Sequence, residues 1–302
     1  MKILLFGKTG QVGWELQRTL APLGEVVALN QGCADGLVGD LTDGAGIRST
    51  IAAVSPDVIV NAAAYTAVDR AESEPDLAHR VNAAALEVLA GEAAACGIWL
   101  VHYSTDYVFD GSGNRPWRED DLPSPLSAYG SSKLAGEEAI QASGCRHLIL
   151  RTSWVYSARG SNFIRTMLKL TSERERLAVI ADQIGAPTGA DLLADVTAHL
   201  VRSVLANPVA HPGGLYHLVA AGETNWHEYA NLIIDEARRR GMALKAKEIT
   251  PILSSDWPSL AARPLNSRLD TTRLRNDFGL RLPDWKFGVM RQLDQILDSA
   301  LP

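Results

Sequence analysis

A tyrosine and a lysine lie four residues apart, at Tyr129 and Lys133, in the segment Ser-Ala-Tyr-Gly-Ser-Ser-Lys-Leu-Ala-Gly-Glu. On a helix this spacing places both side chains on one face, one turn apart. A free tyrosine is a poor acid at neutral pH, because its unperturbed pKa is about 10. A cation beside it lowers that pKa and makes the phenol competent to transfer a proton. The pair predicts a proton donor, although such pairs also occur by chance on solvated helix faces.

The chain also opens with a nucleotide-binding pattern. The apolar run Ile3–Phe6 is typical of a buried parallel strand, and a Gly-x-x-Gly-x-x-Gly pattern follows directly. Its first glycine permits a tight turn, the second admits a pyrophosphate to the backbone, and the third lets the next helix pack on the strand. We expect that helix to begin near Gln11 and to turn its free N–H groups toward the phosphates. The residues assigned to this site are Gly7, Gly10, Gln11, Val12 and Gly13.

The Gly-Lys-Thr within this pattern resembles part of the phosphate-binding loop of NTPases. That motif needs a glycine five residues before Gly7, and the sequence has Lys2 there. The NTPase interpretation is therefore excluded.

Composition narrows the class of protein. The chain has 302 residues, 46% of them hydrophobic, and a net charge of −6, which argues against a nucleic-acid partner. Its three cysteines, Cys33, Cys96 and Cys145, show no metal-binding spacing, and an odd number suits a reducing compartment. We find neither a signal peptide nor an apolar run long enough to span a membrane. We expect a soluble, cytoplasmic protein without a membrane partner.

Short apolar runs alternate with helical stretches through the first half. This alternation predicts an α/β fold with a Rossmann-type doubly wound parallel sheet, formed mainly by residues 1–153. The expected strands are Ile3–Phe6, Val26–Leu29, Val58–Val60, Leu100–Ser104 and Leu148–Arg151, and one expected helix is Ala78–Cys96.

Residues 154–302 contain more prolines, and we expect them to form a smaller C-terminal substrate domain that is partly interleaved with the domain of residues 1–153. A helix is expected at Trp226–Gly241, where Asn225-x-x-Glu228 looks like a capping box.

Several residues at the carboxyl ends of the expected strands suit a nicotinamide cofactor, because ligands of open α/β sheets bind at that edge. Asn30 follows the second strand where NAD-specific enzymes usually carry an acidic residue. It would tolerate the 2′-phosphate of NADPH without excluding NADH, or it is an ordinary loop asparagine. The other residues assigned to the cofactor are Asp40, for the adenine amino group, with Leu41, Ala63, Ala64, Tyr65, Thr66, Tyr129 and Lys133.

Together, the glycine pattern, Tyr103–Phe109 and Tyr129-x-x-x-Lys133 resemble the extended short-chain dehydrogenases/reductases that act on nucleotide sugars. Further segments are similar to the dTDP-4-dehydrorhamnose reductase family and extend over most of the chain. These segments are 7–13, 61–69, 104–111, 151–156, 182–188 and 263–267.

This resemblance implies an NAD(P)H-dependent reduction of the 4-keto group of dTDP-4-dehydro-6-deoxy-L-mannose to dTDP-L-rhamnose. It implies that Tyr129 protonates the alkoxide, that Lys133 lowers the tyrosine pKa and holds the nicotinamide ribose, and that Thr105 hydrogen-bonds the carbonyl oxygen. Asp106 and Trp154 match positions that line the sugar pocket, although Trp154 could equally be a core tryptophan.

Arg263 lies in a segment that resembles the nucleotide-side loop of the family, and an arginine fork suits a diphosphate. It could instead pair with a surface carboxylate.

The family also implies magnesium between the two subunits of a homodimer, bound by acidic side chains. Glu15, Asp191 and Asp294 are the candidates here, with Glu15 on a solvated helix face as the alternative.

Two other functions remain open at this stage. An epimerase or dehydratase of the same fold would fit, but a dehydratase typically has Asp-Glu after its threonine, and here Thr105 is followed by Asp106-Tyr107. The regulatory subunit of methionine adenosyltransferase resembles the same family, so a non-catalytic role is the second alternative.

Overall fold

The computed structural model describes residues 1–298 and has a six-stranded sheet at its centre, in the order β12-β7-β6-β5-β1-β2. Every neighbouring pair in this sheet is parallel. The predicted α/β fold with a doubly wound parallel sheet is confirmed. The six strands are β1 (Lys2–Phe6), β2 (Glu25–Leu29), β5 (Val58–Asn61), β6 (Trp99–Thr105), β7 (His147–Thr152) and β12 (Gly214–His217).

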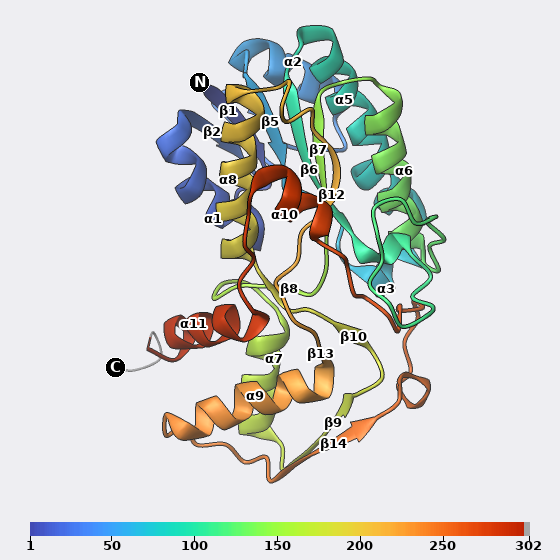
Figure 1. Cartoon of the computed structure of the whole chain (residues 1–302), viewed down its shortest axis with the longest axis vertical. Coiled ribbons are helices and arrows are strands. Elements are labelled where there is room, and N and C mark those ends of the chain that lie inside the picture. The colour runs from blue at the N-terminus through green and yellow to red at the C-terminus, as the bar shows by residue number, and fades with distance from the viewer. Residues whose placement is uncertain (299–302) are drawn as a thin grey trace.

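Helices cover both faces of this sheet (Figure 1). Helices α1 (Gln11–Leu20) and α8 (Ala190–Ala206) pack with one side, where Leu5 and Val60 of the strands are buried. The other side is covered by α2 (Gly44–Val54), α5 (Ala85–Cys96) and α6 (Ala128–Ala142). Leu4 and Leu5 belong to different core clusters, because successive side chains of a strand point to opposite faces. Strands buried on both sides read as continuous apolar runs, which is why the sequence revealed them.

The expected helix Ala78–Cys96 is divided into three parts. It consists of α4 (Pro75–His79), a π-helical turn η2 (Arg80–Ala84) and α5, which ends at Gly97 with a φ of +68°. Asn82 in the π turn donates hydrogen bonds to the Tyr65 carbonyl (3.0 Å) and the Ser132 hydroxyl (3.0 Å). The turn thereby ties the loop after β5 to helix α6, as π turns often do at functional sites.

A second lobe lies below the sheet in Figure 1 and has its own core around Ile164, Tyr229 and Val289. The Asn225 side chain caps α9 by accepting from the Glu228 N–H (2.8 Å), as predicted. The box is not reciprocal, since Glu228 accepts from the Thr224 hydroxyl (3.0 Å). The lobe contains α7 (Phe163–Glu173), α9 (Trp226–Arg239), α11 (Trp285–Asp298), and the paired strands β9 (Arg176–Ile180) and β14 (Glu248–Ile252).

The two halves of the sequence are interleaved. Helix α8, strand β12 and helix α10 (Thr272–Phe278) come from beyond residue 154, yet they pack with the central sheet. Strand β12 was missed because a strand of four residues that begins within Pro-Gly-Gly and ends at a loop gives no periodic signal.

The remaining elements are short. They are η1 (Ala21–Leu23), β3 (Cys33–Ala34), β4 (Leu37–Val38), α3 (Val68–Ala71), η3 (Asp106–Val108), β8 (Val155–Tyr156), β10 (Ile184–Gly185), β11 (Thr188–Gly189), β13 (Thr224–Asn225) and η4 (Ser254–Asp256). Within residues 1–298 no helix is both long enough and apolar enough to cross a membrane.

Candidate active site

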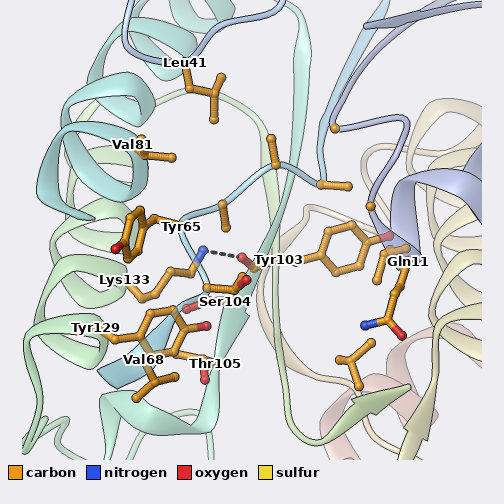
Figure 2. A pocket seen from close by; sticks show the side chains of 18 of the residues that line it. Gln11, Leu41, Tyr65, Val68, Val81, Tyr103, Ser104, Thr105, Tyr129 and Lys133 are labelled. Carbon is orange, nitrogen blue, oxygen red and sulfur yellow. Dashed lines mark hydrogen bonds between the residues drawn. The ribbon is translucent and has the colours of Figure 1, made fainter. Parts of the chain in front are cut away.

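A cavity of about 760 Å³ runs along the carboxyl ends of β1, β5, β6 and β7 (Figure 2). It spans the switch point of the sheet, where the chain places β2 on one side of β1 and β5 on the other. Two predicted binding residues, Gly13 and Arg263, do not line it. The predicted residues that do are Gly7, Gly10, Gln11, Val12, Asn30, Asp40, Leu41, Ala63, Ala64, Tyr65, Thr66, Thr105, Asp106, Tyr129, Lys133 and Trp154.

Three glycines form the turn at one end of the cavity. Gly7 has a φ of +88°, and a Cβ there would lie 2.7 Å from the Ala63 nitrogen. A Cβ on Gly13 would lie 2.0 Å from the Gly7 carbonyl oxygen, so Gly13 permits the helix–turn contact from behind the cavity wall. Gly10 caps α1 without any side-chain hydrogen bond, which leaves N–H groups at the helix N-terminus for a ligand. This arrangement fits the pyrophosphate of a dinucleotide.

The residues assigned to adenosine lie beside this turn. The Asn30 Oδ1 accepts from the Gly32 N–H (3.3 Å), so its side chain already shapes its own loop. The Asp40 Oδ1 accepts from both the N–H and the hydroxyl of Thr42 (2.8 Å each). Both residues line the cavity while fixing the loop that carries them.

At the opposite end, helix α6 brings Tyr129 and Lys133 to the carboxyl end of β6, where Thr105 lies (Figure 2). Ser127 caps the start of this helix, because its hydroxyl accepts a hydrogen bond from the Gly130 N–H (3.1 Å). Burial raises the pKa of Tyr129 to about 12, and a hydrogen bond with Thr105 opposes this shift. Our prediction that the Tyr129 pKa is lowered was therefore wrong in its net direction.

Burial is the first cause of this raised pKa, and the amine of Lys133 contacts groups other than the phenol. Its Nζ donates to the Tyr103 carbonyl (2.6 Å) and lies 2.9 Å from the His102 Nε2. The side chain is 1% exposed, and burial lowers its pKa to about 7. In this geometry the amine is directed into strand β6, and burial dominates the environment of the phenol.

Four buried polar atoms at the ends of β6 and β7 have no hydrogen-bond partner among the residues described. Ser104 and Thr152 lie at the carboxyl ends of the neighbouring strands β6 and β7, and Asp106 and Ser153 directly follow these two strands. Burial raises the pKa of Asp106 to about 6, with Ser267 and Thr105 opposing the shift through hydrogen bonds. Unsatisfied groups of this kind in a cavity suit a polar ligand. We had not assigned Thr152 and Ser153, although their position directly after a buried strand was a usable signal. The atoms are Ser104 Oγ, Asp106 Oδ2, Thr152 Oγ1 and Ser153 Oγ.

Trp154 lines the cavity and is also packed. Its ring stacks on Trp226 with 3.8 Å between centroids and 18° between planes. The residue has a φ of +49°, a strained conformation for a bulky side chain that the surroundings must hold in place. The Trp226 Nε1 donates to the Gln183 Oε1 (3.0 Å), which fixes the ring beneath Trp154.

Arg263 pairs with a carboxylate, as our alternative interpretation proposed. Its Nη2 lies 2.7 Å from the Asp69 Oδ2, and the Ala261 N–H also donates to Asp69 (3.2 Å). This links the loop that carries Arg263 to α3, beside the cavity.

The three candidate magnesium ligands are engaged with other groups. The Glu15 Oε2 lies 3.4 Å from the Arg18 Nη2. The Asp191 Oδ2 accepts a hydrogen bond from the Gln292 Nε2 (3.0 Å), and Asp294 forms an ion pair with Arg240. Residues 1–298 contain no group of three His, Cys, Asp or Glu side chains that could hold a metal ion. Within one copy of the chain these carboxylates do not fit a magnesium site.

Known proteins are similar to this chain over nearly its whole length. A family model described as RmlD substrate binding domain matches residues 1–297. dTDP-4-dehydrorhamnose reductase of Shigella flexneri is 54% identical over 300 residues, covering 99% of each chain. The protein of the same name from Burkholderia thailandensis is 47% identical over 297 residues, covering 96% of this chain and 97% of the relative. This chain belongs to the dTDP-4-dehydrorhamnose reductase family.

Solved structures of the family share the fold. The crystal structure of a dTDP-4-dehydrorhamnose reductase from Clostridium acetobutylicum matches with a TM-score of 0.87 and 33% identity, covering 98% of this chain and 100% of that one. The Bacillus anthracis reductase, solved in complex with NADP, matches with a TM-score of 0.85 and 32% identity, covering 97% and 99%.

Proposed function

We propose that this protein uses NADPH to reduce the 4-keto group of dTDP-4-dehydro-6-deoxy-L-mannose (dTDP-4-dehydrorhamnose) to dTDP-L-rhamnose, a precursor of cell-surface polysaccharide. The observation that carries the proposal is one continuous cavity, with the glycine turn at one end and Tyr129 with Thr105 at the other. The names of relatives that cover nearly the whole chain support the choice of substrate.

Bound NADPH supplies the hydride, and the chain must supply the proton. Tyr129 is suited to this, because a pKa of about 12 keeps the phenol protonated throughout the neutral range. The sugar oxygen becomes an alkoxide as the carbonyl is reduced, and it takes the proton of the Tyr129 hydroxyl. The hydrogen bond between Tyr129 and Thr105 lowers the tyrosine pKa, and this favours the phenolate that remains.

The substrate would contact the polar end of the cavity. Thr105 and Asp106 are buried beside Tyr129, and Trp154 offers an aromatic wall against a sugar ring. We assign Arg263 to the nucleotide part of the substrate, because its guanidinium lies beside the cavity at α3 and a planar fork suits a diphosphate.

The cofactor would lie along the remainder of the cavity. Its pyrophosphate fits the turn at Gly7 and Gly10, its adenosine fits Asn30 and Asp40, and its nicotinamide ribose would meet Lys133. The NADP complex of the Bacillus anthracis reductase supports NADPH as the cofactor. Since Asn30 carries no charge, we propose that NADH is also accepted.

Turnover of purified protein with NADPH and the keto sugar tests the proposal. We expect NADPH oxidation that depends on the sugar, with dTDP-L-rhamnose as the product by mass and chromatography. An epimerase would convert a sugar without net oxidation of NADPH, and a non-catalytic subunit would bind without turnover. Either result would contradict the proposal.

We further propose a cytoplasmic homodimer with magnesium bound between its two subunits. Glu15, Asp191 and Asp294 would need ligands from a second copy, because one copy does not assemble them. Sedimentation with and without a chelator tests this. The same monomer–dimer distribution and full activity in both conditions would rule out a structural metal.

A further inference from the structure

The amine of Lys133 is one end of a buried chain of hydrogen bonds that has no role in the proposed reaction. Its Nζ donates to the Tyr103 carbonyl (2.6 Å) and faces the His102 Nε2 (2.9 Å). His102 lies on β6 and is 1% exposed, and the chain continues from its ring to Asn61 on β5. The protonation states along this chain follow from the donors and acceptors alone.

The amide of Asn61 has a fixed orientation. Its Oδ1 accepts from the Ala63 N–H (3.1 Å), and a backbone N–H can only donate. The Nδ2 of Asn61 therefore faces the ring of His102, at 3.2 Å from Nδ1. An amide NH₂ can only donate, so Nδ1 of His102 must accept.

This assigns the proton of the imidazole. With Nδ1 accepting, a neutral ring carries its hydrogen on Nε2, which points at Lys133. Burial holds the pKa of His102 well below its usual range, so the ring is neutral. An ammonium has three donors and no acceptor, and it would turn a donor toward the donor on Nε2. A neutral amine accepts from Nε2–H and still donates to the Tyr103 carbonyl.

We propose that His102 is a positioning residue that holds Lys133 as a neutral amine through its Nε2–H, so that protonation of Lys133 breaks this hydrogen bond and releases the ammonium toward the cavity. His102 then acts on the cofactor site only through the lysine. Asn61 and His102 are both buried, so solvent does not reach this chain of hydrogen bonds from the side of the sheet.

The charges around the amine of Lys133 are consistent with a neutral amine. Glu137, one turn further along α6, raises the pKa of Lys133, but burial outweighs it. The carboxylate of Glu137 already receives three contacts from Arg151, at 2.6, 2.9 and 3.2 Å, so little of its charge is left to stabilise an ammonium. The titratable or charged side chains that act on the amine are His102 of β6 and Glu137 of α6, which is paired with Arg151 of β7. Tyr103 of β6, Asp106 of η3 and Tyr129 of α6 line the cavity together with Lys133.

The consequence for catalysis rests on the proposed function, whereas the hydrogen-bond chain does not. If the ammonium of Lys133 binds the nicotinamide ribose, affinity for NADPH should fall as pH rises through about 7, where the amine becomes neutral and returns to His102. His102 would thus set the pH at which the cofactor contact is lost.

Nuclear magnetic resonance of the ligand-free wild-type protein tests the first part. Imidazole nitrogen shifts should show His102 as the neutral Nε2–H tautomer. Lysine labelled at Cε, with the Lys133 signal identified by its loss in Lys133→Met, should titrate near neutral pH. An Nδ1–H tautomer, or a Lys133 signal that titrates in the ordinary lysine range, would overturn the proposal.

The variant His102→Gln tests the second part, because the glutamine can turn its carbonyl oxygen toward an ammonium. We expect the Lys133 midpoint to move upward by about one pH unit or more, one unit being a tenfold change in the protonation equilibrium. His217→Gln is the matched control, since His217 is an equally buried strand histidine on β12. Equal midpoints in His102→Gln and wild type, or an equal shift in the control, would contradict the role of His102.

NADPH titration across pH then separates the two proposals. In wild type the affinity should decline above neutral pH, and in His102→Gln the decline should begin about one unit higher. Wild-type protein that binds no NADPH would contradict the proposed function and leave the resonance result intact. Binding with the same pH midpoint in both proteins would contradict the positioning role alone.

Discussion

At the β1–α1 end of the cavity the ligand-facing surface is backbone, whereas at the β6–β7 end it consists of buried side chains. The glycine turn offers N–H groups whose positions depend on close packing, as at Gly13 against Gly7. The other end buries hydroxyls and the Asp106 carboxyl, several of them unpartnered, and shifts the pKa values of Tyr129 and Lys133. Damage to the first end should therefore act on cofactor affinity, and loss of the Tyr129 hydroxyl at the second end should act on turnover.

The largest effect is expected at the side-chain end, from Tyr129→Phe. The variant loses one hydroxyl, so the fold and the NADPH affinity should remain, while kcat should fall by roughly 10²–10⁴-fold, as is typical for a lost general acid. Steady-state kinetics and NADPH titration measure the two quantities separately. Near-wild-type turnover would mean that another group donates the proton.

The backbone end is tested by Gly13→Ala. The new Cβ would lie 2.0 Å from the Gly7 carbonyl oxygen, so the turn must shift. Overpacking of this kind costs about 1–3 kcal/mol, and we expect a lower melting temperature together with an increase of about tenfold in the NADPH Kd.

Gly91→Ala is the control for this substitution. Nothing lies within 4 Å of a Cβ at that position in α5, so alanine should stabilise the helix by about 0.5–1 kcal/mol. If Gly13→Ala kept its NADPH affinity, the glycine turn would not position the cofactor.

An effect of similar size is expected at Arg263, which lies outside both ends. Arg263→Ala should raise the KM for the dTDP-sugar by roughly tenfold, since a hydrogen bond to a charged group contributes about 1.5–3 kcal/mol. NADPH affinity should stay the same. Asp69→Asn, measured alongside, removes the charge of its partner. Equal KM values in the two variants would show that Arg263 acts only through Asp69.

The smallest effect is expected from Asn30→Asp at the adenosine end. A carboxylate accepts from the ribose 2′-hydroxyl of NADH and repels the 2′-phosphate of NADPH. At a half-buried position the change should be on the order of 1 kcal/mol, a few-fold decrease in the ratio of NADPH to NADH efficiency. An unchanged ratio would show that Asn30 does not face the ribose.

The same contrast explains how much the sequence predicted. The turn at Gly7, the strand runs and the Tyr129–Lys133 spacing depend on neighbours within a few residues, and these local patterns indicated the sheet and most of the cavity wall. The direction of Lys133 could not be predicted in this way, because His102 and Asn61 meet it only after β5, β6 and α6 have packed.

Other misses have the same cause. The pairing of Arg263 with Asp69 joins residues 194 positions apart, and the Trp154–Trp226 stack joins two lobes of the chain. A pKa shift caused by burial, as at Tyr129, likewise cannot be inferred from the one cation nearest in sequence.

Strand β12 and helices α8 and α10 have a consequence for how the protein is made. On the ribosome, the sheet has its first five strands by residue 152, but its β12 edge is added only at residues 214–217, and α10 follows at 272–278. Until then β7 exposes an unpaired edge, and the apolar surface that α8 covers remains open. The nascent chain therefore presents an incomplete, aggregation-prone sheet until these elements are made, and a fragment ending at residue 153 would keep that defect permanently.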